Sequence, residues 1–273
     1  MTHLRAPVLV LFAAALVNCA APPAPAPAPG PAAPFPNGTI VDLSHAYGED
    51  TVFWPTADKF KLDVISAGMT PAGFYYAANK FTTAEHGGTH LDAPVHFAAG
   101  RRAVDEIPLD HLIGPAVVVD VTAASAQNAD HLVTVADFEA FERSHGRIPD
   151  GAILLVRTGF SSRWPDAARY LGTAERGAAA VPMLHFPGID PAAATWLVAN
   201  RAIHAVGIDT ASIDYGQSTT YESHRILYDA NIPGLENLNA LDTLPPTGAF
   251  IVALPMKIRG GSGAPLRAIA IVP

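Results

Sequence analysis

Short runs of apolar residues, many of them β-branched, recur along the chain from about residue 37 onward, and polar, glycine-containing or proline-containing segments separate them. Runs of this length bounded by turn signals are typical of buried β-strands. The pattern predicts strands at residues 39–43, 116–121, 152–156, 205–208, 250–254 and 268–272.

Helix signals are fewer than strand signals. Thr134 can cap a helix that has Asp137 in its first turn, and Asp190 followed by Pro191 is a strong helix start. We expect helices at residues 135–144, 192–200 and about 224–231. Strands that outnumber helices in mixed order predict a single α/β domain with a mixed sheet, whose strand order the pattern does not reveal.

The first residues have the pattern of an export signal. Arg5 provides the positive charge that precedes the apolar run of a signal peptide. The apolar run at residues 6–17 is too short to span a bilayer comfortably. Leu16 stands three positions before Cys19, which resembles a bacterial lipoprotein box, although Asn18 replaces the usual small residue. The alternative is an ordinary secretory peptide cut after a nearby alanine, and we favour lipidation of Cys19.

The chain therefore divides into a signal peptide at residues 1–19, an alanine- and proline-rich linker at 20–36 and one domain at 37–273. The linker has few apolar side chains to bury, so we expect an extended spacer. The last segment is long enough for one sizeable core. We expect an exported bacterial protein, either periplasmic or anchored to a membrane through a lipid on Cys19.

Charge and cysteine content narrow the possible partners. The chain has 17 lysines and arginines against 25 acidic residues, a net charge of −8. It has no basic patch interleaved with aromatic residues, so we expect no nucleic acid partner. One cysteine cannot form an internal disulfide. We expect a homo-oligomer, a dimer or larger, that binds a small molecule.

The stretch His-Gly-Gly-Thr-His-Leu-Asp-Ala-Pro-Val-His-Phe begins at His86 and holds three histidines and one aspartate within eleven positions. Imidazole and carboxylate suit zinc, manganese or iron, and no thiolate is nearby. The glycines and Pro94 oppose a helix. We expect a glycine turn and a short extended segment in which His90 and Asp92 point to the same side, before Pro94 redirects the chain toward His96.

This stretch resembles the H-x-G-T-H-x-D-x-P-x-H signature of the metal-dependent cyclase-like hydrolases, a group that includes bacterial kynurenine formamidase and isatin hydrolase. The resemblance runs from about Thr39 to the C-terminus. It implies that His86, His90 and Asp92 bind metal. It also implies that His96 transfers protons, and that the chain has the swivelling β/β/α fold, in which a barrel-like sheet carries the metal loop.

A second group of candidate ligands lies far along the sequence. His224 and Glu236 stand twelve positions apart, on either side of an Asn-Ile-Pro-Gly turn signal. Alone, this pair is a weak signal, because a histidine at a helix start and an acidic loop residue are common. The resemblance implies a metal role, since two-metal members of the family draw a histidine and a glutamate from this region. Asp92 would then bridge the two ions.

Aromatic residues that precede the metal stretch are candidates for a wall of the substrate site. Phe53 and Trp54 could contact a flat aromatic substrate, and so could the cluster at residues 74–76. Packing in the core or at an interface is the alternative for all of them. We favour the wall only for Phe53 and Trp54.

The remaining polar candidates are expected to be structural. Asp209 and Asp214 follow a buried strand, where we expect them to bond loop amides. The other histidines have no ligand-rich surroundings; they are His3, His45, His111, His131, His145, His185 and His204.

These residues favour hydrolysis by an activated water. A divalent ion with an open position lowers the pKa of bound water to about 7 and polarises a carbonyl group. The sequence has no G-x-S-x-G nucleophile motif. We predict a metal-dependent amidohydrolase that binds one or two Zn²⁺ or Mn²⁺ ions and acts on C–N bonds other than peptide bonds. Its substrate would be an isatin-like lactam or an N-formylkynurenine-like arylformamide.

Three alternatives stay open. The first is a lactonase or other small-ester hydrolase of the same family. The second is an exported metal-binding protein without catalysis, which would have no need of the spare base His96. The third is a binding module that keeps the loop but binds no ions.

Overall fold

The computed structural model describes residues 37–273. The predicted signal peptide at 1–19, with Cys19, and the linker at 20–36 therefore lie outside the described residues. Within residues 37–273, no helix is both long and apolar enough to cross a membrane.

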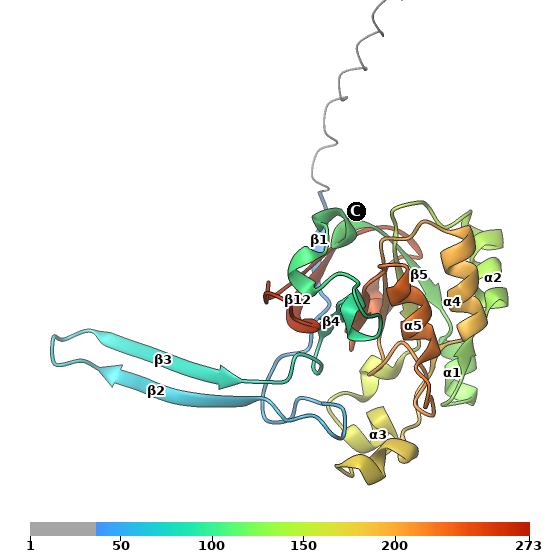
Figure 1. Cartoon of the computed structure of the whole chain (residues 1–273). Coiled ribbons are helices and arrows are strands. Elements are labelled where there is room, and N and C mark those ends of the chain that lie inside the picture. The colour runs from blue at the N-terminus through green and yellow to red at the C-terminus, as the bar shows by residue number, and fades with distance from the viewer. Residues whose placement is uncertain (1–36) are drawn as a thin grey trace, which may run out of the picture. The chain divides into compact units, whose positions relative to one another are not determined.

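The centre of the described chain is an eight-stranded sheet with the strand order β1-β12-β11-β5-β7-β9-β10-β4 (Figure 1). Its strands are β1 (Thr39–Asp42), β4 (His90–Asp92), β5 (Ile113–Asp120), β7 (Ile153–Arg157), β9 (Ala205–Ile208), β10 (Gly234–Glu236), β11 (Thr247–Pro255) and β12 (Gly263–Val272). Strands β5, β7, β9 and β10 run parallel, whereas the other pairs are antiparallel. The predicted mixed sheet in a single α/β domain is confirmed.

Strand β4 closes this sheet on itself, because it pairs with β10 on one side and with β12 on the other. His90 lies opposite Glu236 of β10. Asp92 lies opposite Gly263 of β12, and all three residues of β4 are buried. The closure produces the expected barrel-like sheet and carries part of the metal stretch into the interior.

Successive residues of the central strands alternate between two cores, as the period of a β-strand requires. In β5, Val117 and Val119 pack in a core shared with helix residues such as Phe138 and Leu197. Val118 packs in the other core, with Leu91 of β4. Strands buried on both faces read as continuous apolar runs, which is why the sequence pattern detects them.

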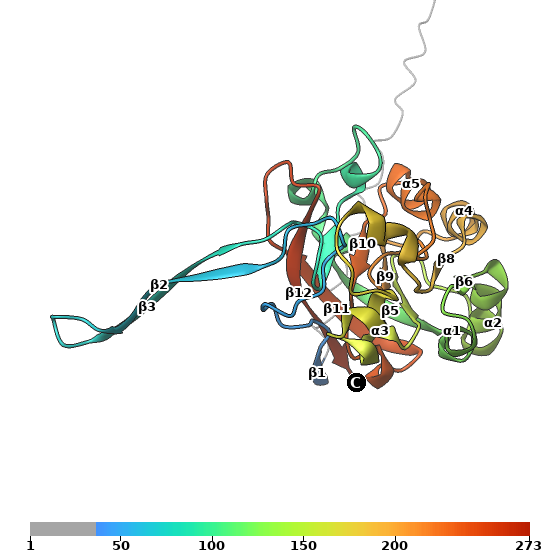
Figure 2. The same cartoon turned by 90° about the horizontal axis from the view of Figure 1, so that it is seen from below.

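Helices gather along one side of the sheet in both cartoon views (Figures 1 and 2). They are α1 (Thr122–Gln127), α2 (Val135–His145), α4 (Pro191–Asn200) and α5 (Glu222–Asp229), while α3 (Ala167–Leu171) lies apart from them. Short 3₁₀ segments lie at Pro94–His96, Val104–Glu106, Leu109–His111, Phe160–Arg163, Ala178–Met183 and Leu241–Thr243. A parallel pair, β6 (Leu132–Val133) and β8 (Gly188–Ile189), joins two of the loops.

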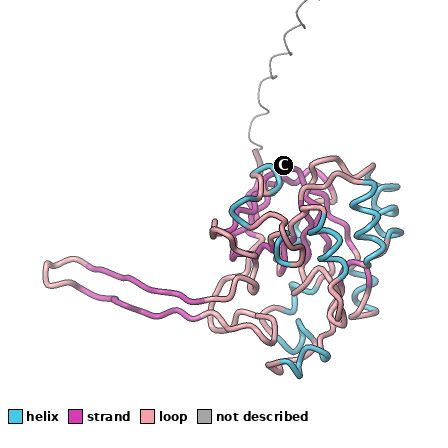
Figure 3. The backbone as a smooth tube through the Cα atoms, viewed as in Figure 1, coloured by secondary structure: helices cyan, strands magenta, loops and turns pink. Residues whose placement is uncertain are grey.

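A long hairpin leaves this body as a separate arm. It consists of β2 (Lys61–Met69) and β3 (Tyr75–Thr82), which pair only with each other among the described strands. The backbone tube shows the two strands running out from the body side by side (Figure 3).

The predicted strands and helices are present, with ends that differ by a few residues. The strands correspond to β1, β5, β7, β9, β11 and β12, and the helices to α2, α4 and α5. The apolar pattern did not indicate the β2–β3 hairpin, because neither of its strands is buried. It also did not indicate β4 and β10, which have three residues each and are too short to show a period.

Candidate metal centre

The turn before β4 depends on its two glycines. Gly87 has φ +153° and Gly88 has φ +59°, values that favour glycine. A Cβ atom on Gly87 would lie 2.0 Å from the Phe53 ring, and one on Gly88 would lie 2.5 Å from the Tyr47 ring. The Tyr47 hydroxyl lies 2.6 Å from the Gly87 carbonyl oxygen and 2.8 Å from that of Thr89. The turn is thus held between two aromatic rings.

The first group of candidate ligands comes from this single stretch. His86 Nδ1 lies 2.6 Å from Asp92 Oδ1, and His90 Nε2 lies 3.0 Å from the same oxygen. His90 and Asp92 are 2% and 1% exposed. One atom from each of the three side chains lies within 4.8 Å of the others, so the group could hold a metal ion.

The second group combines Asp92 with residues that are distant in sequence. His224 Nε2 lies 3.1 Å from Glu236 Oε1 and 3.5 Å from Asp92 Oδ2. His90 Nε2 lies 3.5 Å from Glu236 Oε2, so the two groups adjoin. Asp92 therefore presents Oδ1 to His86 and His90 and Oδ2 to His224, the arrangement expected of a bridging carboxylate.

The hydrogen bonds of the three histidines show that this donor set fits a cation. His90 Nδ1 lies 2.9 Å from the Gly88 carbonyl oxygen, to which it can only donate. In the neutral ring, Nε2 then carries a lone pair, and this buried nitrogen has no hydrogen-bond partner. Its 3.0 Å distance to Asp92 is short, but it is not a hydrogen-bond geometry. A nitrogen placed in this way is suited to coordinate a metal.

Hydrogen bonds orient the rings of His224 and His86 in the same way. His224 Nδ1 lies 2.5 Å from Asp214 Oδ2 and donates to it, which leaves Nε2 free to coordinate. The Ser262 hydroxyl donates to Glu85 Oε2 at 2.6 Å, so it accepts from His86 Nε2 at 2.9 Å. The lone pair of His86 Nδ1 then faces Asp92. All three histidines thus direct a lone pair toward the two carboxylates.

The charges of the centre also favour a cation. When no cation is bound, protonated histidines take its place: burial raises the pKa of Asp92, but the charge of protonated His86 and the nearby imidazoles of His224 and His90 hold it well below its usual range. Among the described residues that line the cavity, none is lysine or arginine. Two buried carboxylates without such partners are costly, and a divalent ion would stabilise them.

Several residues that support the ligands were not predicted. Asp214 was expected to bond loop amides only; it does accept from the amides of Ser223 and His224, but it also orients the His224 ring. Tyr228 donates to Asp92 Oδ2 at 2.9 Å. Asp209 does bond loop amides, as expected, through Thr158 and Gly159. No local sequence pattern marks Asp214, because its partner lies ten positions away in another element.

His96 lies at the edge of the centre. Its ring stacks on His86 with a centroid distance of 3.8 Å, and its Nε2 lies 4.0 Å from Asp92 Oδ2. Burial, together with the neighbouring histidines and despite Asp92, lowers the pKa of His96 to about 4. The ring is therefore neutral at pH 7, and its side chain, which lines the cavity, is 28% exposed.

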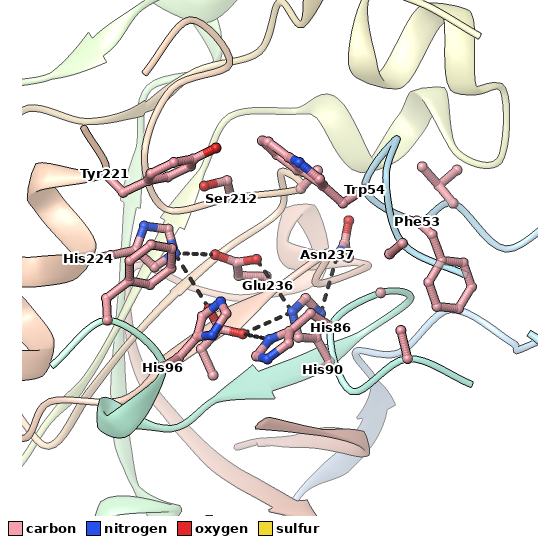
Figure 4. A pocket seen from close by; sticks show the side chains of 17 residues that line it. Phe53, Trp54, His86, His90, His96, Ser212, Tyr221, His224, Glu236 and Asn237 are labelled. Atoms are coloured by element: carbon pink, nitrogen blue, oxygen red, sulfur yellow. Dashed lines mark hydrogen bonds and ion pairs between the residues drawn. The ribbon is translucent and has the colours of Figure 1, made fainter. Parts of the chain in front are cut away.

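A cavity of about 330 Å³ opens over both ligand groups. Its walls include Phe53 and Trp54, the two candidates from the sequence, and Tyr221, which was not a candidate (Figure 4). Phe97, also not a candidate, lines the cavity as well. The Tyr221 ring lies 6.3 Å from Trp54 and 5.1 Å from Phe97. The aromatic cluster at residues 74–76 does not line the cavity; it lies at the exposed end of the hairpin arm.

Known proteins resemble this chain in sequence and in fold. A family model described as "Putative cyclase" matches residues 41–215. Isatin hydrolase of Roseibium aggregatum is 32% identical over 246 residues, covering 87% of this chain and 88% of the relative. Kynurenine formamidase of Salinibacter ruber is 32% identical over 235 residues, covering 84% and 96%. A crystal structure of an isatin hydrolase bound to the product analogue thioisatinate has a TM-score of 0.77 and 32% identity, covering 86% and 92%.

Proposed function

The chain belongs to the cyclase family of metal-dependent hydrolases, and from this premise we propose that it cleaves a small cyclic or N-acyl amide. The observation that carries the proposal is the convergence of three histidine lone pairs and two carboxylates beneath a cavity with aromatic walls. The leading substrate class is an isatin-like lactam, followed by an N-formylkynurenine-like arylformamide.

The donor set assigns the ligands of the proposed ions. His86, His90 and Asp92 would hold one divalent ion, and Asp92 with His224 and Glu236 would hold a second. Nitrogen and carboxylate oxygen donors suit Zn²⁺ or Mn²⁺. When bound, a divalent ion at this site supplies an activated water and polarises the carbonyl group to be cleaved.

The chain's own residues bind the substrate and move the proton. Trp54, Phe97 and Tyr221 present aromatic faces and edges around the cavity, which suits a flat aromatic ring held by stacking. His96, neutral and facing the same cavity, accepts the proton of the attacking water at a ring nitrogen and returns it to the leaving nitrogen.

Two named relatives support the order of substrates. One relative is called isatin hydrolase, and a solved relative holds a product analogue of isatin hydrolysis, thioisatinate. The other is called kynurenine formamidase. Both names describe an amide attached to an aromatic ring, which matches the aromatic walls of this cavity.

The test is a substrate panel on metal-depleted protein to which Zn²⁺ or Mn²⁺ is returned. We expect metal-dependent hydrolysis of isatin or N-formylkynurenine, and its loss in the His90→Ala variant. Hydrolysis of simple lactones alone would indicate a lactonase of the same family. Protein that regains its metal but cleaves none of these compounds would contradict the proposal and favour a non-catalytic metal-binding protein.

We further propose that the protein is exported and anchored through Cys19, on the basis of the apolar run and the lipoprotein-like box. The full chain should then partition with membranes in a bacterial host, and Cys19→Ala should release it or alter its processing. Equal solubility of the two forms would contradict lipidation and leave secretion alone.

A further inference from the structure

One wall of the cavity is a short loop at residues 53–57, which we call the wall loop. Phe53, Trp54 and Ala57 of this loop line the cavity. The loop belongs to none of the helices or strands of residues 37–273, and its own turn is closed by the Ala57 amide, which donates to the Trp54 carbonyl oxygen at 3.0 Å. Surface loops are among the parts of a fold that open most easily, so the shape of this wall depends on contacts from elsewhere in the chain.

The start of the wall loop is fixed by the glycine turn before β4. The Phe53 side chain is only 2% exposed, and its ring packs against Gly87. One residue earlier, the Val52 carbonyl oxygen accepts a hydrogen bond from the Gly88 amide at 3.0 Å. Burial and this backbone bond hold the first residues of the loop beside the metal centre.

Trp54 is held less firmly by its own side chain, because it is only partly buried. Its ring makes an edge contact with Phe186 and a tilted contact with Tyr221, at centroid distances of 6.4 and 6.3 Å. Two such contacts fix a side chain less completely than full burial does. The backbone beneath Trp54 therefore needs a further anchor.

Arg176 supplies this anchor from a segment that lies 122 positions after Trp54. Its Nη1 donates to the Trp54 carbonyl oxygen at 3.1 Å and to that of Phe53 at 3.4 Å. Its Nη2 donates to the carbonyl oxygen of Ala57. One guanidinium group thus joins both ends of the wall loop.

Gly177 adds a fourth bond to the same loop. Its amide donates to the Pro55 carbonyl oxygen at 2.9 Å. It has φ +89° and ψ 179°, a conformation that is essentially restricted to glycine. The chain can therefore turn at Gly177 and present its amide and the Arg176 side chain to the wall loop together.

The chemistry of arginine suits this contact. A guanidinium group stays charged and carries five N–H donors in a rigid planar fork, so it can bond several carbonyl oxygens at once. Hydrogen bonds from a charged donor are also stronger than those from a neutral one. Arg176 is exposed, does not line the cavity and belongs to neither ligand group, so it acts on the wall from outside.

We propose that Arg176 is a positioning residue, which holds Trp54 in place to stack on the aromatic substrate. This inference rests on the function proposed above. A wall that is ordered beforehand does not have to be ordered during binding, which would weaken the affinity. Because the glycine turn is held by Phe53 and Val52 instead, loss of Arg176 should weaken substrate binding and leave metal binding unchanged.

The first test is steady-state kinetics of the metal-loaded full chain with isatin. Arg176→Ala should raise KM roughly 3–10-fold, the effect of ordering a side chain during binding, with kcat and metal content unchanged. Arg176→Lys keeps the charge but offers a single nitrogen, so its KM should lie closer to that of Arg176→Ala than to that of the parent. Arg169→Ala, which removes an arginine of α3 that does not line the cavity, is the matched control.

The second test needs no substrate and measures hydrogen–deuterium exchange by mass spectrometry. In Arg176→Ala, the Ala57 amide should exchange at least about 10-fold faster, because the bonds that hold its turn from outside are lost. The Gly88 amide, which is bonded to Val52 at the start of the loop, should exchange at the parent's rate. Melting temperature establishes that each variant is folded, and Arg176→Lys is measured in place of Arg176→Ala if that variant is not.

Unchanged KM, or unchanged exchange at Ala57, in a folded Arg176→Ala variant would overturn the inference. Loss of metal in this variant would also overturn it, because Arg176 would then support the metal centre instead of the substrate wall. An Arg176→Lys variant with the parent's KM would show that the positive charge alone is sufficient and would overturn the positioning role. A parent that cleaves no amide would contradict the proposed function, and the exchange rate at Ala57 would still decide whether Arg176 holds the wall loop.

Discussion

The metal centre and the hairpin arm both depart from the usual distribution of side chains between interior and surface. The centre buries polar and charged side chains, and the arm exposes apolar ones. At the centre, His90, Asp92, His224 and Glu236 are buried, although carboxylates are rarely buried unless they are paired. On the arm, eight large apolar side chains are exposed; they are Leu62, Val64, Ile65, Met69, Phe74, Tyr75, Tyr76 and Phe81. Each region carries a local cost: the centre buries two carboxylates without a lysine or arginine beside them, which a divalent cation would stabilise, and the arm exposes apolar surface to water.

The two regions also differ in how they are held. The ligand rings are fixed by hydrogen bonds that they donate to residues outside the ligand set, His86 to Ser262 and His224 to Asp214. The arm is fixed by its own ladder of backbone bonds and by the aromatic contact at Phe60. Single substitutions should therefore change metal binding strongly when they are made at the centre and only slightly when they are made in the arm.

The largest effect is expected at His90. Its Nε2 is buried and faces both carboxylates, so His90→Ala should lose metal and activity together.

His96 lies beside the ligands but 4.0 Å from Asp92. His96→Ala should therefore keep the metal and lose roughly 10²–10⁴-fold in rate, the usual contribution of a positioned acid–base group.

Elemental analysis and steady-state kinetics on both variants separate a ligand from a base. If His96→Ala loses metal as completely as His90→Ala, His96 is a ligand and another group moves the proton. If His96→Ala is nearly as active as the parent, the reaction needs no side-chain base.

A smaller effect is expected for the second ligand group. Glu236 accepts from the Ile213 amide and lies 3.1 Å from His224 Nε2. If two ions bind, Glu236→Ala should lower the metal content from about two ions per chain to about one, with the first group intact. Mass spectrometry of the native protein measures this count. An unchanged count in folded protein would assign Glu236 a structural role.

The next smaller effect on metal binding is expected for the hydrogen bonds that orient the ligand histidines. Ser262 accepts from His86 Nε2 and donates to Glu85, so it fixes which nitrogen of His86 coordinates. Ser262→Ala should weaken metal binding roughly 10–100-fold, the usual cost of losing such support. Competition with a chelator measures the affinity, and Ser144→Ala, a surface hydroxyl on α2, is the control. Equal affinity in both variants would show that His86 is oriented by packing alone.

The same contrast explains what the sequence could predict. The first ligand group lies in one stretch, so the density of histidines near Gly87 and Gly88 was enough to suggest it. The second group depends on β10 pairing with β4, a long-range contact between three-residue strands. His224 and Glu236 became candidates only through the family resemblance, and their position beside Asp92 comes from the structure.

The supporting residues and the arm were harder to predict for two physical reasons. Asp214, Ser262 and Tyr228 act through contacts that the fold creates, and each is an ordinary polar residue in its own segment. The arm lacks the buried apolar run that identifies a strand in a folded body, since its apolar residues alternate across a bulge. The cluster at Phe74 and Tyr75 was therefore considered as a site wall, although it lies at the far end of the arm.

The smallest expected effect tests whether the two regions are coupled. Phe60 lies between Phe81 of the arm and Tyr47, whose hydroxyl holds the turn before His90. An aromatic pair contributes about 0.5–1.5 kcal/mol, which corresponds to roughly 2–10-fold in an equilibrium constant. Phe60→Ala should therefore weaken metal binding by about that factor, whereas Tyr76→Ala, at the outer end of the arm, should not. Chelator competition on the two variants gives the comparison. A Phe60→Ala variant with the parent's affinity would mean that the turn is held by Tyr47 and Phe53 alone, and that the arm has no influence on the metal centre.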